Sequence, residues 1–232
     1  MTSEFEFHKM LCEDAKTNEF LLKQDKQIGE SYNLVIELWN FCFEVEIECS
    51  RKNLSSLSAM LLFVVEQRLC SMMNALLLGD IPACYMFMRV ILEGVVDGVV
   101  ASIRVPDLPF PKNFEWLKEI EDEKHFSFND KCKLLLPSWV SNETKEKCYE
   151  LWKELSEYWV HANGTIKKLQ KRYEEETKNL EVPPMWALAL PCTYNVPGTN
   201  EVDEDSRADL KELAYNLKEL SLIVKEILNG LL

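Results

Sequence analysis

Three charged side chains follow one another at four-residue spacing in the apolar stretch 81–104, within the segment "MRVILEGVVD". They are Arg89, Glu93 and Asp97. At about 100° per residue on a helix, this spacing places all three within one sector of about 80°. An arginine in line with two carboxylates can form an ion pair, bind a polar ligand or raise the pKa of one carboxyl by repulsion. These residues are therefore the first candidates for a functional site.

Two interpretations of this charged line are open. In the first it is a narrow solvent-exposed stripe, where Arg89 and Glu93 form a surface ion pair worth a few tenths of a kcal/mol. In the second it faces a cleft between helices, where Arg89 binds Glu93 and where Asp97 crowds Glu93 from the next turn. Two acids so placed raise one carboxyl pKa unless a cation lies between them. The order of Arg before Glu is the poorer one for a solvated pair, which favours the cleft.

The opposite side of the same predicted helix carries small residues. Gly94, Gly98 and Ser102 recur there every four residues. Each glycine destabilises a helix by about 1 kcal/mol relative to alanine. We therefore expect a neighbouring helix to approach this face closely.

Helical periodicity dominates the rest of the chain. Gly79 is typical of a helix end, Asp80 of a helix start, and the prolines after Arg104 prevent continuation. The sequence predicts one all-α domain over 1–232, a bundle of about seven to nine helices around the buried helix 81–104. The stretch 183–205 is predicted to be irregular, either a cover over the bundle or a plain connector. Helices are predicted over 30–48, 55–78 (capped by Ser55 or Asn53), 81–104, 113–124, 129–136, 141–162, a charged continuation to about 180, and from Ser206 onward.

Composition limits the partners of this chain. The net charge of −13 repels phosphate backbones, so we expect no general nucleic-acid binding. The acidic segment "MTSEFEFHKM" has no apolar signal core, so we expect a cytoplasmic location. The stretches 57–78 and 81–103 are long and apolar but contain charges, each of which costs roughly 2.5–3.5 kcal/mol at a bilayer centre. We expect core helices of a soluble protein and no membrane partner.

The eight cysteines do not form a metal-binding pattern. None stands in a Cys-x-x-Cys pair, and neither Cys42 with Cys49 nor Cys132 with Cys148 has zinc-ligand spacing. We expect mostly buried thiols, although internal disulfides would be common in the cytosol of a hyperthermophile. Phosphate-binding loops, paired Glu-x-x-His motifs and HExxH motifs are not found in the sequence, so no cofactor and no metal are predicted.

Two segments carry a resemblance to known proteins. In "GDIPACYMFMRVILE" the residues Arg89 and Glu93 stand four apart, and "LSEYWVHANG" contains Tyr158 and His161. Over roughly 55–165 the chain resembles an uncharacterised family of all-helical prokaryotic proteins, similar to the HEPN and abortive-infection helical bundles. The resemblance implies that Arg89, Glu93 and His161 meet in space, with Lys131 or Lys133 nearby. Ribonucleases of the HEPN class have an arginine separated from the histidine by four to six residues on one helix, and here the corresponding positions are Glu154, Leu155 and Ser156.

Three functions follow as hypotheses. The first is a non-catalytic protein that acts through homodimerisation or a protein partner, which the resemblance places in a defence or stress system. The second is a small-ligand or nucleotide-binding domain that uses a polar seam, and the third is a metal-dependent or nuclease-like hydrolase. His161 is either a helix-edge residue bonded to a carboxylate or a general base or ligand. The candidate seam comprises Arg89, Glu93, Asp97, Tyr158 and His161.

Overall fold

The protein is an all-α helical bundle, as the sequence predicts. The computed structural model describes residues 16, 19, 21–52, 54–104, 112–124, 126–157, 202 and 206–231. These form eight α-helices and two π-helical segments. In chain order they are α2 (Lys26–Arg51), α3 (Ser55–Met60), η1 (Leu61–Val65), α4 (Glu66–Leu78), α5 (Ile81–Arg104), α6 (Lys112–Lys124), α7 (Phe128–Asp130), η2 (Lys131–Leu135), α8 (Asn142–Leu155) and α10 (Ser206–Asn229).

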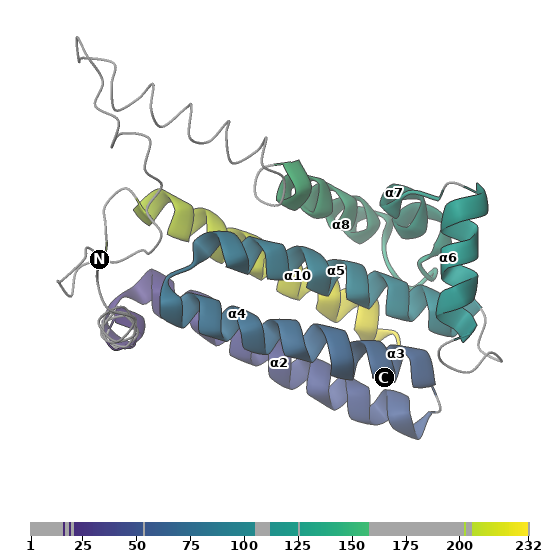
Figure 1. Ribbon diagram of the computed structural model, residues 1–232, viewed down its shortest axis with the longest axis horizontal. Coiled ribbons are helices and arrows are strands. Elements are labelled where there is room, and N and C mark those ends of the chain that lie inside the picture. The colour runs from purple at the N-terminus through teal and green to yellow at the C-terminus, as the bar shows by residue number, and fades with distance from the viewer. Residues whose placement is uncertain are drawn as a thin grey trace, which may run out of the picture.

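Long helices packed side by side form the core: α2, α5, α10 and the continuous helix made of α3, η1 and α4, called the α3–α4 rod (Figure 1). The helix made of α3, η1 and α4 packs between α2 and α5, and α10 packs on the other side of the same two helices. Ion pairing of Arg207 with Asp25, at 2.7 Å, joins the starts of α10 and α2, and Lys52 donates a hydrogen bond to the Leu231 carbonyl where both end. Accordingly α10 runs parallel to α2 and α5, and the α3–α4 rod runs antiparallel to them.

The predicted helix 81–104 begins and ends where the sequence places it. Gly79 ends α4 in the left-handed conformation with φ 76°, which favours glycine because it has no Cβ. The side chain of Asp80 accepts a hydrogen bond from the Ala83 N–H at 3.0 Å and so starts α5. This helix packs against both the core and the outer helices, which confirms its central position.

The small-residue face of α5 lies against α3 and η1, as the glycine spacing predicts. A Cβ at Gly98 would stand 2.9 Å from Leu57 Cδ1, and one at Gly94 would stand 3.3 Å from Val65 Cγ2. The Ser102 hydroxyl accepts a hydrogen bond from the Leu57 N–H at 2.9 Å. Of the two predicted caps for this helix, Ser55 is wrong because it lies inside the helix, and Asn53 lies outside the described residues. Instead Ser102 on the neighbouring helix satisfies the free N–H in its first turn.

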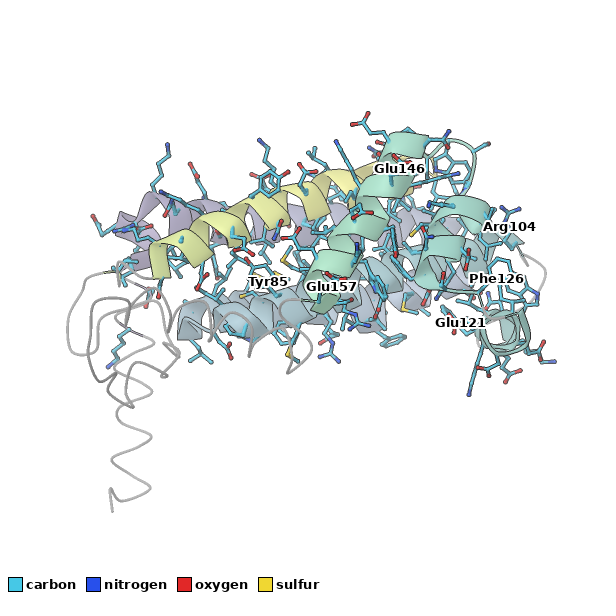
Figure 2. All side chains as sticks on the ribbon, turned by 90° about the horizontal axis from the view of Figure 1, so that it is seen from above. Tyr85, Arg104, Glu121, Phe126, Glu146 and Glu157 are labelled. Carbon is cyan, nitrogen blue, oxygen red and sulfur yellow. The ribbon has the colours of Figure 1, made fainter. Side chains whose placement is uncertain are left out.

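The outer helices cover the opposite side of α5. In Figure 1, α8 lies along α5 and α10, while α6 and α7 stand at the end of the bundle where α5 finishes. Figure 2 shows Glu121 of α6, and Phe126 just before α7, at that end near Arg104. The predicted irregular segment 183–205 lies outside the described residues except for Val202, as does the chain beyond 157 in the predicted helix 141–162.

Candidate functional site

The charged line of α5 is in contact with Trp152 of α8. Arg89 Nε donates a hydrogen bond to Glu93 Oε1 at 3.0 Å, and Trp152 Nε1 donates to the same oxygen at 2.7 Å. The Arg89 guanidinium also lies over the Trp152 ring, 5.2 Å from its centroid. We call these three residues the Glu93 cluster. Each member contacts the other two, so the cluster fastens α8 to α5.

The Trp152 ring is itself packed among aromatic side chains. Phe128 of α7 stacks on it with 5.0 Å between ring centroids, and Tyr149 lies 6.2 Å away at an interplanar angle of 21°. A tryptophan so placed buries a large apolar area while its N–H still needs an acceptor. Glu93 supplies that acceptor, so the indole is held by packing and by a charge-assisted hydrogen bond together.

Asp97, the last residue of the charged line, is paired with a lysine from η2. Lys131 Nζ lies 2.7 Å from Asp97 Oδ1 and also pairs with Glu121 of α6. The lysine is buried, with 6% of its surface exposed. We call Lys131, Asp97 and Glu121 the Lys131 cluster. It joins η2 and α6 to the middle of α5.

Arg104 fastens the other end of η2. Its guanidinium donates hydrogen bonds to the Leu134 carbonyl at 3.0 Å and to the Leu135 carbonyl at 3.1 Å. These carbonyls stand at the C-terminal end of η2, where backbone acceptors have no partner within the segment. Two cations, one at each end, therefore hold η2 on α5.

The pKa values of Asp97 and Lys131 are shifted within the Lys131 cluster. Burial raises the pKa of Asp97 to about 6, with Glu121 and Glu93 adding to the rise while Lys131 opposes it. Burial alone would lower the pKa of Lys131, but the Asp97 and Glu121 carboxylates outweigh it and raise that pKa. At neutral pH the pair is therefore ionised, and Asp97 takes up a proton as the pH falls through about 6.

The charged line is neither a fully exposed stripe nor a sealed seam. The side chains of Arg89, Glu93 and Asp97 are 21%, 33% and 23% exposed. The helices α8 and η2 cover one side of the line, and the remaining area faces solvent. Of the two interpretations of this line, the one in which it lies against neighbouring helices describes the contacts better. Lys131 is the cation beside Asp97, and the second carboxylate that it pairs with is Glu121 rather than Glu93.

Part of the predicted site lies outside the described residues. Tyr158 and His161 are in that part, so their meeting with Arg89 and Glu93 stays a prediction. Lys131 joins the charged line, whereas Lys133 lies over the Tyr149 ring at 5.9 Å. Within the described ranges, no group of three or more His, Cys, Asp and Glu side chains is placed to hold a metal ion.

Two members of these clusters were not predicted from the sequence. Its spacing in the sequence places Trp152 on the apolar side of its helix, and only the need of its indole N–H for an acceptor indicates a polar contact. Glu121 stands in the run "EIEDEK", where nothing distinguishes it from its acidic neighbours. Its role depends on how α6 packs at the end of the bundle, which the sequence does not show.

A second surface feature lies on the outer side of the α3–α4 rod. Phe63 is 68% exposed and Leu62 beside it is 38% exposed. Next to them is an open depression of about 480 Å³. Ser50 and Ser58 donate hydrogen bonds to Glu46 Oε1 at 2.9 and 2.7 Å on this side of the bundle. We call this region the Phe63 surface, and its depression is lined by Ser50, Ser55, Ser58, Ala59, Leu62 and Phe63.

The helix that carries the Phe63 surface is long and largely apolar. Among the described helices, Ser55–Leu78 alone has the length and composition that would allow it to cross a membrane. In its most apolar window, 39% of the residues are buried inside the protein. The remainder of this apolar helix is thus left partly or fully accessible.

The fold and the two clusters define an all-helical bundle whose outer helices are fastened to a charged line on the central helix. Comparison of the chain with protein-family models, with curated proteins and with solved structures finds no match in any of the three. A proposal about function therefore rests on the residues of this chain and on the contacts between them.

Proposed function

We propose that this protein acts mainly by protein–protein contact, through homodimerisation or a protein partner, and that the Phe63 surface is the contact site. The observation that carries the proposal is the exposure of Phe63 and Leu62 beside the depression. Contiguous exposed apolar area of this kind is typical of interaction sites, and aromatic residues are enriched at the centre of interfaces.

The polar groups around the Phe63 surface fit the same role. Protein interfaces combine an apolar centre with a polar rim that makes hydrogen bonds at the edge. Here Ser50, Ser55 and Ser58 supply hydroxyls next to Phe63 and Leu62. Glu46 already accepts hydrogen bonds from two of the serines, which holds this rim in place before any partner binds.

The charged line is proposed as a structural feature within this function. Glu93 accepts hydrogen bonds from both Arg89 and Trp152, and Lys131 is shared by two carboxylates. A ligand would have to replace these contacts before it could bind. The line is therefore proposed to hold α8, η2 and α6 in place on a soluble, cytoplasmic protein, in the defence or stress setting that the resemblance implies.

The test is the oligomeric state of the full chain, measured by sedimentation equilibrium over a range of concentrations. We expect a dimer that Phe63→Glu converts to a monomer, because a buried charge at the centre of an interface is unfavourable. Tyr215→Glu on α10 is the matched control, since Tyr215 is 63% exposed on another helix and should leave the dimer intact.

Other outcomes separate the alternatives. A wild-type chain that is monomeric at all concentrations contradicts the homodimer and leaves a different protein as partner. Binding to lipid vesicles that Phe63→Glu abolishes would instead assign the surface to a membrane. Equal behaviour of the Phe63 and Tyr215 variants in both measurements would overturn the proposed contact site.

Ligand binding at the charged line is a second candidate, favoured by the partial exposure of Arg89 and Glu93. A nucleotide phosphate would compete with Glu93 for the arginine. Isothermal titration with ATP distinguishes this candidate, because binding that is lost in Arg89→Ala would support it. An absence of heat with the folded wild-type chain would remove it for nucleotides.

A further inference from the structure

Two buried thiols stand in contact where η2 meets α8. The Cys132 thiol donates to the Cys148 sulfur with 3.6 Å between the two Sγ atoms, and neither residue is exposed to solvent. The two cysteines are sixteen residues apart in the sequence and lie on different elements. The two sulfurs are thus already in contact, and a disulfide would require them to approach to about 2.05 Å.

We propose that Cys132 and Cys148 are a redox-modification site, at which a peroxide converts the thiol pair into an intramolecular disulfide that fastens η2 to α8. One sulfur attacks hydrogen peroxide and becomes a sulfenic acid as hydroxide leaves with the thiol proton as water. The second sulfur then displaces the hydroxyl group as a second water and forms the S–S bond. In sum, two thiols and one hydrogen peroxide give one disulfide and two waters. The sulfurs lose two electrons and the peroxide gains them.

The position of the pair gives the bond a structural effect. Cys132 follows Lys131 directly, and Cys148 stands one helical turn before Trp152. The disulfide would therefore link the two elements that supply Lys131 to Asp97 and Trp152 to Glu93. The Lys131–Asp97 contact and the Trp152–Glu93 contact would then be made by two elements that a covalent bond links.

Access to the pair depends on opening of η2. Contact with Cys132 and burial both raise the pKa of Cys148 well above its usual range, so little thiolate forms in the closed state. The reaction requires η2 to move transiently away from α5 and α8, and the contacts of Lys131 and Arg104 that hold η2 on α5 oppose this movement. A water-sized oxidant suits such a site, because a small opening suffices to admit it.

The experiment is oxidation of the folded full chain with hydrogen peroxide, followed by peptide mapping without reduction. We expect a Cys132–Cys148 cross-link that forms more slowly than modification of the exposed Cys70 and that dithiothreitol reverses. Closure of a loop of this length should raise the Tm by roughly 6–12 °C. Cys132→Ser is the control that cannot form the cross-link and should show no such rise.

Two comparisons make the test decisive. Cys42 on α2 is equally buried, and it should remain unmodified while the cross-link forms, since its modification would indicate global unfolding. Lys131→Met should speed the cross-link several-fold, whereas Lys133→Met, which changes an exposed neighbour, should not. A wild-type pair that stays reduced until the protein unfolds, or a Cys148 that pairs with another cysteine, overturns the proposal.

Discussion

The two faces of α5 are held to their neighbouring helices by different kinds of interaction. On one face Gly94, Gly98 and Ser102 allow α3 and η1 to approach within van der Waals contact. On the other face Arg89, Glu93 and Asp97 hold α8 and η2 through ion pairs and hydrogen bonds. The first face depends on the absence of side-chain volume, and at Gly98 it leaves no room for an added atom. The second depends on charge and is still partly open to water, so its contacts are weaker and depend on pH.

The largest effect is expected on the small-residue face. Gly98→Val should lower the free energy of unfolding by about 3 kcal/mol, because its added carbons would overlap Leu57 and Met60. Chemical denaturation of the variant and the wild type measures this difference. Gly94→Ala is the control, since its Cβ would stand 3.3 Å or more from its neighbours, and it should change stability far less. Equal losses of stability at the two glycines would show that the close approach of α3 is not the reason for glycine at position 98.

A smaller effect is expected on the charged face. Lys131→Met should lower the free energy of unfolding by about 2 kcal/mol, because it leaves Asp97 and Glu121 facing each other without a cation. Partial exposure of both acids keeps the loss below that of a fully buried pair. Lys26→Met removes an exposed cation paired with Glu30 and should not change the denaturation midpoint measurably. If both lysine variants are equally stable, the Lys131 cluster does not fasten η2.

The smallest effect is a dependence on pH. Because the pKa of Asp97 is raised to about 6 in the folded protein and is about 3.9 in an unfolded chain, the folded state binds this proton more tightly. The stability that Asp97 contributes is therefore fully present below pH 4 and is lost as the pH rises through about 6. Relative to Asp97→Asn, the wild type should gain about 1 kcal/mol between pH 7 and pH 4, which is less than the roughly 2 kcal/mol that the full pKa shift would give over this range, because the Asp97 side chain is partly exposed to solvent. Denaturation of both proteins at each pH tests this, and a gain with the opposite sign would show that Lys131 outweighs burial at Asp97.

The same contrast explains what could be predicted from the sequence. The bounds of α5 follow from Asp80 and from the prolines after it, and the close approach at Gly98 follows from four-residue spacing on one helix. These are local patterns, and the sequence of one helix and its flanking residues is enough to predict them. The partners of the charged face come from α6, η2 and α8, whose approach to α5 depends on how the loops between them close. Trp152 and Glu121 could therefore not be assigned to Glu93 and Lys131 before the packing was known.

The parallel arrangement of α10 with α2 and α5 has a consequence for synthesis on the ribosome. The contacts of Arg207 with Asp25 and of Lys52 with Leu231 join residues about 180 positions apart. The apolar sides of α2 and α5 that face α10 have no cover until that last helix has been translated. A nascent or prematurely terminated chain would carry this open groove, which makes it a natural client for chaperones and proteases.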